Sequence, residues 1–327
     1  MKILVIRFSS LGDVILASVV LEPLYKAGFK VDFLTFKPFD QLYKYDHRLN
    51  KVIALQKNQL KSIKQIYRFA RNLKKENYDY ILDIHANLRS FLISKFSGIK
   101  TIRYKKEGLK RRLGILNPDF NVIKAYLEPL KKLGIKDVQN YRPRLILKEE
   151  EIKAVKPLVP EKFIVIGTGA RYINKIYPYY SKVAHILLEK GFNVVLVGSE
   201  EDKKLDRSEY PSNVVDLRGK LSLRESLAVI SLAELTISND SAIAHMSRAV
   251  RVPVLIIYGA THPYFGFAPL KDEGSFIFKG LECQPCDLHG KGECKRGDRA
   301  CLTFISPEEI VNEALKLLSN KKQFNAT

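Results

Sequence analysis

The chain has 327 residues, 46% of them hydrophobic, and it carries a formal net charge of +20. This length suffices for two ordinary domains with apolar cores. No run approaches the ~20 apolar residues of a membrane-spanning helix, and the N-terminal residues lack the apolar region and cleavage site of a signal peptide, so we expect a soluble, cytoplasmic protein.

The positive charge is concentrated in the first half of the chain. Residues 1–147 contain 30 Lys and Arg against 12 Asp and Glu, a net charge of +18, whereas residues 148–327 contain 25 against 23, a net charge of +2. A one-sided basic surface is typical of a protein that binds a polyanion, which could be nucleic acid, an anionic membrane or a phosphorylated lipid.

A strand, a turn and a helix are predicted at the start of the chain. Residues 3–6 are a compact apolar run, residues 9–12 suit a turn, and Asp13 is expected to open a helix that ends near Lys26. In open α/β sheets, ligands bind beyond the carboxyl ends of the strands, and anions bind at helix N-termini. This junction is therefore one candidate binding site.

Residues 30–36 and 52–55 are expected to be strands, and residues 57–75 a helix with two different faces. Cations recur along it at helical spacing: Lys57, Lys61, Lys64, Arg68, Arg71 and Lys75. Apolar side chains form the complementary stripe: Leu60, Ile63, Tyr67, Ala70 and Leu73. The apolar face should pack on the sheet, and the cationic face is either solvated or in contact with phosphate groups or a membrane.

Asp83 and His85 follow the strand predicted for residues 80–83. They could point into a ligand site or into a hydrogen-bonded core, and we favour structural support because buried polar groups are usually paired. A second basic cluster then lies on a glycine-containing segment and could form a loop that holds an anionic substrate. Its members are Lys105, Lys106, Lys110, Arg111 and Arg112.

A proline-bearing, highly charged stretch at residues 142–161 marks the expected domain boundary, so we predict domains at residues 1–150 and 151–327. The second domain begins with a strand at residues 163–166. Its exit turn contains Gly167 and Gly169, which let the backbone approach a ligand closely. Lys175 follows, and Pro178 suits the first turn of the next helix.

Strands and helices continue to alternate in the second half. Strands are predicted at residues 194–197 and 214–217, and Ser222 with Glu225 forms a capping box for a helix at residues 223–233. Such alternation predicts βαβ units and a parallel sheet in each half.

A second strand–helix junction lies late in the chain. Residues 235–238 read as a buried strand, Asp240 as an N-cap, residues 241–250 as a helix and residues 252–258 as the next strand. Asp240 could be no more than a cap. However, the junction repeats the pattern around Asp13, so each predicted domain has an Asp on a small-residue turn after a strand.

Four cysteines lie within 19 residues: Cys283, Cys286, Cys294 and Cys301. In a cytosolic chain this spacing favours a structural zinc site over disulfides, with free thiols as the third possibility. Abundant Lys and Glu, with two Met and no Trp, also fit a thermophile, in which intracellular disulfides are more common. A last helix is expected from Ser306 to about Leu318.

Three motifs together resemble the ADP-heptose:lipopolysaccharide heptosyltransferases of glycosyltransferase family 9. They are RFSSLGDV at residues 7–14, NKIYP at residues 174–178, and Asn239, Asp240 and Ser241 with His245. The resemblance covers nearly the whole chain. It implies an α/β protein of the GT-B fold, with two Rossmann-like parallel-sheet domains facing each other across a cleft and a last helix that can cross back to the first domain.

The resemblance also implies an activity, the transfer of a heptose from ADP-heptose to the lipopolysaccharide inner core, either lipid A-Kdo or a heptosyl acceptor, with inversion. Asp13 would be the general base, and Lys175 would neutralise the departing diphosphate. The implied donor-binding residues are Ser10, Gly12, Thr168, Gly169, Glu201, Asp240, Ser241 and His245, and the acidic residue after the strand at 194–197 could be Asp202 instead of Glu201. The anionic acceptor would meet basic side chains of the first domain, namely Lys61, Lys64, Arg68, Arg111 and Arg112.

The resemblance implies no cofactor for catalysis, and the chain has no Asp-x-Asp motif to hold a catalytic metal. We expect a monomer in peripheral contact with the inner face of the cytoplasmic membrane. The alternatives are a glycosyltransferase with another nucleotide sugar, a polyanion- or nucleic-acid-binding protein, and a nicotinamide-dependent oxidoreductase. No nucleic-acid module pattern is present, so we expect no nucleic-acid partner. No G-x-G-x-x-G follows the first strand, which argues against the oxidoreductase.

Overall fold

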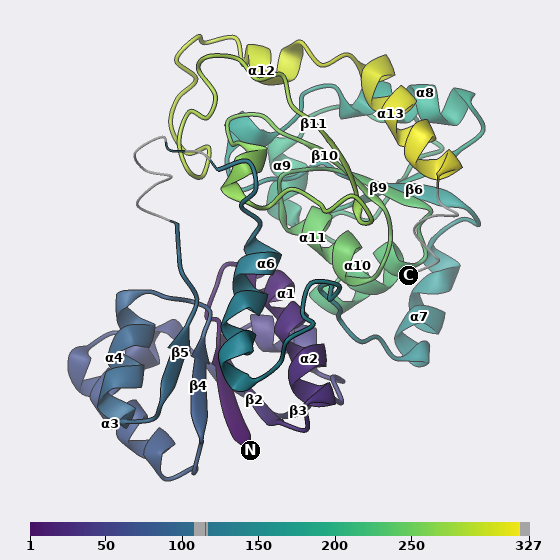
Figure 1. Cartoon of the computed structure of the whole chain (residues 1–327). Helices are drawn as coiled ribbons and strands as arrows, with labels where there is room; N and C mark the ends of the chain where they lie inside the picture. The colour runs from purple at the N-terminus through teal and green to yellow at the C-terminus, as the bar shows by residue number, and fades with distance from the viewer. Residues whose placement is uncertain (108–114, 116, 321–327) are drawn as a thin grey trace. The chain divides into compact units, whose positions relative to one another are not determined.

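The computed structural model describes residues 1–107, 115 and 117–320. The chain divides into two compact units (Figure 1), Met1–Leu109 with Val122–Ile146, and Lys110–Asn121 with Leu147–Thr327. Each unit contains a parallel sheet, as the alternation of strands and helices predicted. In the described part of the chain, no helix is both long and apolar enough to cross a bilayer.

The first unit is built on a five-stranded parallel sheet in the order β3-β2-β1-β4-β5. The strands are β1 (Lys2–Ile6), β2 (Lys30–Phe36), β3 (Leu49–Leu55), β4 (Tyr80–Asp83) and β5 (Thr101–Arg103). β1 is central, and its last residue, Ile6, lies opposite Leu34 of β2 and Asp83 of β4. The chain first builds outward from β1 through β2 and β3 and then crosses to β4, so the strand order reverses between β1 and β4.

The helices of the first unit are α1 (Leu11–Ala17), α2 (Leu21–Lys26), α3 (Ile63–Lys74), α4 (Leu88–Ser97) and α6 (Val122–Leu127). Short 3-10 turns accompany them: η1 (Ser18–Val20), η2 (Phe39–Tyr43), η3 (Lys57–Leu60) and η4 (Glu128–Leu133). Ser10 is the N-cap of α1, and Asp13 occupies its third position. The expectation that Asp13 opens the helix is therefore wrong, and the 3-10 turn η1 divides the expected helix into α1 and α2.

The helix expected at residues 57–75 is in two pieces, and its predicted apolar stripe is wrong at two positions. Ser62 caps α3 and sets a new helical start after η3. From that start, three side chains face the core: Ile66, Ala70 and Leu73. Ile63 and Tyr67 are instead 67% and 49% exposed. Ile63 and Tyr67 belong to the same helix as these three residues, but at 100° per residue they lie at the edge of the face on which Ile66, Ala70 and Leu73 are buried.

The second unit has a six-stranded parallel sheet in the order β11-β10-β9-β6-β7-β8. The strands are β6 (Phe163–Gly167), β7 (Asn193–Val197), β8 (Val215–Asp216), β9 (Leu235–Asn239), β10 (Val254–Ile257) and β11 (Gly274–Ile277). The strand order again reverses beside the first strand, here between β6 and β9. This arrangement is the doubly wound order of Rossmann-type folds.

The helices of the second unit are α7 (Glu149–Val155), α8 (Tyr180–Glu189), α9 (Glu200–Leu205), α10 (Leu223–Ser231), α11 (Ala242–Ala249), α12 (Ala300–Thr303) and α13 (Pro307–Ser319), with η5 (Lys156–Leu158), η6 (Ile173–Lys175) and η7 (Pro263–Phe265). The capping box of Ser222 with Glu225 is confirmed at the start of α10. Pro178 lies before the N-cap of α8, Tyr179, and so is not in the first helical turn as expected.

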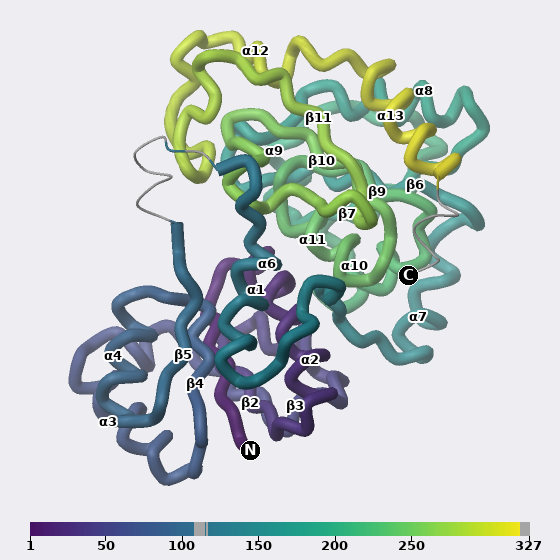
Figure 2. The backbone as a smooth tube through the Cα atoms, viewed as in Figure 1, coloured from purple at the N-terminus to yellow at the C-terminus, as the bar shows by residue number. Residues whose placement is uncertain are grey.

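The last helix belongs to the core of the second unit. α8 and α13 lie side by side (Figure 2) and cover the same core. α13 buries four apolar side chains there: Ile310, Val311, Ala314 and Leu317. The implied crossing of the chain's end back to the first domain stays a prediction.

Candidate functional site

Each sheet reverses its strand order at one point, and the candidate residues follow the two strands that meet there. In the first sheet, Asp13 and His85 come after β1 and β4, which pair directly. In the second sheet, Gly169 and Asp240 come after β6 and β9, which also pair. We call these places the β1–β4 site and the β6–β9 site. Such reversal points are where open α/β sheets bind ligands.

Asp13 is held by a guanidinium and two hydroxyl groups at the β1–β4 site. Its Oδ1 lies 2.7 Å from Nη2 of Arg7 and accepts a 3.3 Å hydrogen bond from the hydroxyl of Tyr126. Its Oδ2 accepts hydrogen bonds from Oγ and the backbone N–H of Ser10, at 2.8 and 3.2 Å. The Asp13 side chain is still 19% exposed. It is therefore an oriented, reachable carboxylate, as a general base must be.

Arg7 ties this carboxylate to the segment after β4. Burial opposes the charged form of Arg7, but Asp13, with Tyr126 and Tyr104, outweighs burial, so the pKa of Arg7 lies above its ordinary value. The same guanidinium donates a 2.8 Å hydrogen bond to the carbonyl of Ile84. Arg7 therefore fixes the position of Asp13 relative to both strands of the site.

Asp83 and His85 shape the turn after β4. Asp83 is fully buried, and it accepts hydrogen bonds from Arg103 and from the backbone N–H groups of His85 and Ala86. This is the structural support that the sequence favoured. The His85 ring packs edge-on against Phe8, and its buried Nδ1 has no hydrogen-bond partner among the described residues. Burial, and then repulsion from Arg7, lowers the pKa of His85 to about 3.

We expect His85 to make the protein less stable in acid. The pKa of His85 falls from 6.5 to about 3 on folding, so between those values the unfolded chain binds a proton that the native protein does not. The contribution of His85 to the free energy of unfolding is complete above pH 6.5. As the pH falls from 6.5 towards 3, the free energy of unfolding decreases by roughly 1.4 kcal/mol per pH unit. Urea unfolding of the parent and His85→Gln across this interval would measure it. A free-energy difference between the two proteins that does not change with pH would contradict the assignment.

Asn239 joins three segments at the β6–β9 site, a role that the sequence did not reveal. Its Nδ2 donates to the carbonyls of Thr168 and Gly169, at 2.9 and 3.2 Å. Its Oδ1 accepts from the backbone N–H of Tyr177 and the hydroxyl of Tyr180, both at 3.0 Å. Because all these partners are distant in sequence, only the fold could identify them. The side chain fixes the exit turn of β6 against the segment that carries Lys175.

Asp240 is not the N-cap of α11, as the sequence predicted, because Ser241 occupies that position. The strand β9 continues to Asn239, which delays the helix by one residue. Asp240 Oδ2 instead lies 2.8 Å from Nζ of Lys175 and accepts a 2.9 Å hydrogen bond from Thr261. Burial alone would raise the pKa of Asp240, but Lys175, with His245 and Thr261, outweighs burial and holds that pKa below its ordinary value. The pair directs one ammonium group into the β6–β9 site.

Gly169 gives the exit turn of β6 its close contact with α9. A Cβ at this position would lie 2.0 Å from Oδ1 of Asp202. Asp202 also accepts hydrogen bonds from Oγ and the backbone N–H of Ser199, the N-cap of α9. Glu201, the residue proposed for donor binding, is exposed one position earlier. Of these two acidic residues, Asp202 is the one that contacts the glycine turn.

Gly169→Ala should therefore displace Asp202 and disturb the start of α9. Overpacking of this kind typically costs about 1–3 kcal/mol, which thermal unfolding can measure. Gly292→Ala is the matched control, because its Cβ would meet Asp287 at an ordinary 3.4 Å. Equal melting temperatures for the two variants would contradict the close contact at Gly169.

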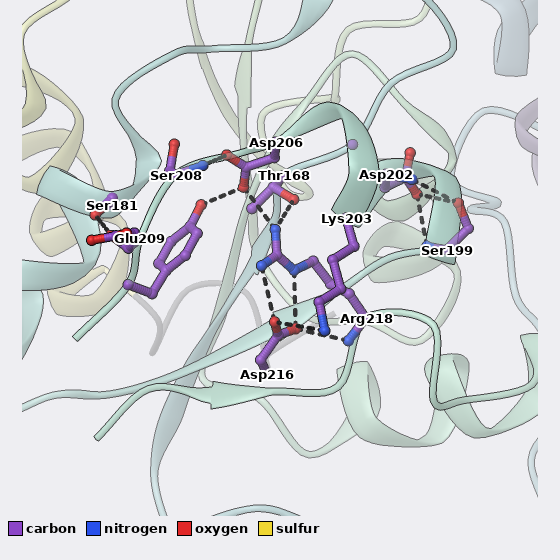
Figure 3. A network of polar contacts seen from close by, with 12 residues as sticks. Thr168, Ser181, Ser199, Asp202, Lys203, Asp206, Ser208, Glu209, Asp216 and Arg218 are labelled. Carbon is purple, nitrogen blue, oxygen red and sulfur yellow. Dashed lines mark hydrogen bonds and ion pairs between the residues drawn. The ribbon is translucent and has the colours of Figure 1, made fainter. Parts of the chain in front are cut away.

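Thr168 is hydrogen-bonded inside the second unit through both its side chain and its carbonyl. The residue is fully buried, and its Oγ1 lies 3.2 Å from Nη1 of Arg218. Figure 3 shows the same guanidinium between Asp206 and Asp216, which it contacts at 2.7 and 2.9 Å. This network fixes the segments after β6, α9 and β8 together.

Ser241 and His245 lie at the start and in the middle of α11. Ser241 Oγ is 3.1 Å from Oγ of Ser238, and it does not cap the helix through its side chain. His245 is 4% exposed and lies 3.4 Å from Nη1 of Arg248. The imidazole is therefore packed inside the second unit, and the direct sugar contact implied for it stays a prediction.

Three of the basic residues expected to hold the acceptor lie in the first unit. Lys61, Lys64 and Arg68 are exposed around the start of α3, and they form no ion pair among the described residues. Arg111 and Arg112 lie outside the residues that the structure describes. Gly12 is the second residue of α1 and Ser10 its N-cap, so both border Asp13.

The cysteine segment packs against the β6–β9 site. None of the four cysteines forms a disulfide, and no group of three or more His, Cys, Asp or Glu in the described chain is arranged to hold a metal ion, so the zinc site stays a prediction. Burial, and then the nearby Cys286, Cys294 and Cys283, raise the pKa of the Cys301 thiol to about 11. The segment has other partners: Cys286 N–H donates to the carbonyl of Ala260 at 2.9 Å, and Gly290 packs on the Lys175 side chain.

The relatives of this chain are bacterial heptosyltransferases. The sequence profile of glycosyltransferase family 9 (heptosyltransferase) matches residues 66–295. A lipopolysaccharide heptosyltransferase 1 from Campylobacter coli is 26% identical over 298 residues, which cover 81% of this chain and 85% of the relative.

Solved structures show the same fold. A family 9 glycosyl transferase from Veillonella parvula is 22% identical, with a TM-score of 0.80 and coverage of 98% of this chain and 97% of that one. The E. coli heptosyltransferase WaaC with ADP-2-deoxy-2-fluoro heptose is 16% identical, with a TM-score of 0.69 and coverage of 97% and 99%. The predicted GT-B fold with two parallel-sheet domains is confirmed. The chain belongs to glycosyltransferase family 9, the heptosyltransferase family.

Proposed function

We propose that this enzyme transfers a heptose from ADP-heptose to the inner core of a lipopolysaccharide precursor, with inversion at the anomeric carbon. The observation that carries the proposal is the ion pair of partly buried Lys175 with buried Asp240, 2.8 Å apart, beside the glycine turn after β6 and the start of α11. A fixed cation next to a helix N-terminus is suited to a diphosphate. The E. coli relative crystallised with an ADP-heptose analogue supports ADP-heptose as the donor.

In the proposed donor site, Lys175 stabilises the negative charge that develops on the departing diphosphate. Backbone N–H groups at the start of α11 assist, because the side chain of Ser241 does not bond to them. Gly169 allows the chain to approach the nucleotide, and Asp240 keeps the ammonium group directed. Asp202 replaces Glu201 as the acidic residue nearest the glycine turn.

In the proposed transfer, an acceptor hydroxyl oxygen attacks the anomeric carbon and forms the new glycosidic bond. The bond from that carbon to the diphosphate oxygen breaks, and ADP leaves with the electron pair. The hydroxyl proton passes to the carboxylate of Asp13. Arg7 and Ser10 keep this carboxylate oriented at some cost in basicity, since such contacts stabilise its ionised form.

The proposed acceptor is an anionic lipid held by Lys61, Lys64 and Arg68, with Arg111 and Arg112 as further candidates. The net charge of +18 on residues 1–147 supports this assignment. We therefore place the working enzyme at the inner face of the cytoplasmic membrane, as a monomer. The family match argues against the oxidoreductase and the nucleic-acid-binding alternatives.

Incubation with ADP-heptose and heptose-free lipid A-Kdo, followed by mass spectrometry, tests the proposal. A parallel reaction with an acceptor that already carries one heptose distinguishes the two possible acceptor positions. We expect one of the acceptors to gain a single heptose with release of ADP. Transfer from another nucleotide sugar, with none from ADP-heptose, would instead support the alternative donor.

A further inference from the structure

Four large apolar side chains on α3 and α4 face solvent. Ile63, Tyr67, Leu88 and Phe91 are 67%, 49%, 72% and 42% exposed. Elsewhere in the described part of the first unit, only Met1 and Tyr25 are large, apolar and exposed. Single exposed apolar residues are ordinary, but a group of them on adjoining elements marks an interaction surface.

Ile63 and Tyr67 are four positions apart on α3, and Leu88 and Phe91 are three positions apart on α4, so each pair lies on one side of its own helix. α3 and α4 pack side by side (Figure 1), and the Tyr67 ring contacts the ring of Phe96 on α4, with centroids 5.4 Å apart. Arg89 Nε donates a 3.0 Å hydrogen bond to the carbonyl of Leu60, which joins the starts of the two helices. α3 follows β3 and α4 follows β4, so both helices begin at the carboxyl edge of the sheet, where the β1–β4 site lies.

The same helices carry positive charge and no negative charge. α3 contributes Lys64, Arg68, Arg71 and Lys74, α4 contributes Arg89 and Lys95, and neither helix contains Asp or Glu. Arg103 also lies over the Phe91 ring, 5.1 Å from its centroid. Solvated protein surfaces usually mix both signs. We call this surface, apolar side chains with surrounding cations, the α3–α4 face.

We infer that the α3–α4 face docks on an anionic lipid bilayer. Ile63, Leu88 and Phe91 enter the interfacial layer, Tyr67 lies at headgroup level, and the cations meet lipid phosphates. The inference deepens the proposed function, on which it rests for the lipid nature of the acceptor. It adds the surface by which the β1–β4 site is held close to that lipid.

Charge and chemistry favour a bilayer over the other partners. A second copy of the chain placed on this face would bring two cationic, acid-free surfaces together, which costs free energy. A nucleic acid would satisfy the cations but would leave aliphatic Ile63 and Leu88 without an apolar environment. A bilayer with anionic headgroups satisfies both kinds of side chain.

Co-sedimentation with vesicles of equal parts phosphatidylethanolamine and phosphatidylglycerol tests the surface. Ile63→Ser combined with Leu88→Ser should weaken binding at least ~10-fold, because each inserted aliphatic side chain contributes about that factor when fully buried. Tyr67→Ser and Tyr25→Ser form a matched pair, since these tyrosines are 49% and 48% exposed and each makes one edge-on ring contact. Only Tyr67→Ser should weaken binding.

Transfer assays separate this inference from the proposed function. With a deacylated, water-soluble acceptor, Ile63→Ser/Leu88→Ser should keep the parental rate, and with the acceptor in vesicles it should lose at least ~5-fold. The parent could bind vesicles through the α3–α4 face and yet transfer no heptose, a result that would support the docking surface and remove the proposed function. Three results would overturn the docking surface. They are parental vesicle binding by the double variant, equal effects of Tyr67→Ser and Tyr25→Ser, and a dimer that the double variant dissociates.

Discussion

Asp13→Asn is expected to lower the kcat/KM of heptose transfer by at least ~10²-fold, in the range typical of a lost general base. The amide keeps the shape of the side chain and an oxygen for Tyr126, but it cannot take the acceptor proton. Steady-state kinetics with ADP-heptose and the acceptor identified by mass spectrometry would measure the loss. The donor affinity, measured by calorimetry, should change little because Asp13 belongs to the acceptor side of the reaction.

A matched variant separates catalysis from helix capping. Glu225 occupies the third position of α10 and completes a capping box with Ser222, as Asp13 does with Ser10 in α1. Glu225→Gln should cost only about 0.5–2 kcal/mol of stability and should leave transfer unchanged. Asp13→Asn removes the counter-charge of Arg7, which could destabilise the protein. Circular dichroism at the assay temperature is therefore the check, and it should show the variant still folded. A folded Asp13→Asn enzyme with near-parental kcat/KM would remove Asp13 from the mechanism.

Lys175→Ala should lower transfer by roughly 10²–10³-fold, as expected for loss of a group that stabilises developing charge. It should also weaken ADP-heptose binding, because the diphosphate loses its nearest cation. The variant leaves the carboxylate of Asp240 buried without its ion-pair partner, a change that typically costs about 3–5 kcal/mol. Kinetics, calorimetry and thermal unfolding together would report these three effects.

Two further variants separate the catalytic loss from the structural one. Lys175→Ala combined with Asp240→Asn removes the uncompensated charge, so it should recover stability without recovering transfer. Lys279→Ala breaks the partly exposed 2.7 Å pair with Glu309, away from both sites, and should leave transfer intact. Recovery of transfer in the Lys175/Asp240 double variant would show that Lys175 acts only by supporting Asp240.

The sequence predicted the elements of the fold well because their signals are local. Buried apolar runs marked most strands, and the Ser222 capping box marked the start of α10. Both candidate sites also fell where the sheet order reverses. Their position follows from one rule, since polar residues after the first and fourth strands of such a sheet meet at its carboxyl edge.

The errors came from choices that the local sequence leaves open. Asn239, Asp240 and Ser241 are all good N-caps, so the sequence could not show that β9 continues through Asn239 and that Ser241 is the cap. At α3, the predicted apolar stripe was too wide for one buried face. Ile63 and Tyr67 lie at the edge of the face that buries Ile66, Ala70 and Leu73, so they are exposed and form part of the α3–α4 face.

The remaining contacts depend on residues distant in the chain. Asn239 bonds to residues 59–71 positions away, and Thr168 is 50 positions from Arg218. No periodicity predicts such contacts, because they arise only when the sheet is assembled. The cysteine spacing likewise permits zinc, disulfides or thiols. The contacts of the cysteine segment with Ala260 and Lys175 also join residues distant in the chain, so the spacing could not predict them.

The anomeric configuration of the product tests the central claim most directly. A general base that activates an acceptor hydroxyl for a single displacement must give a product inverted relative to the donor. Nuclear magnetic resonance of the heptose transferred by the parent enzyme should therefore show the configuration opposite to that of ADP-heptose. A retained configuration would contradict the role of Asp13, because it requires a different path at the anomeric carbon.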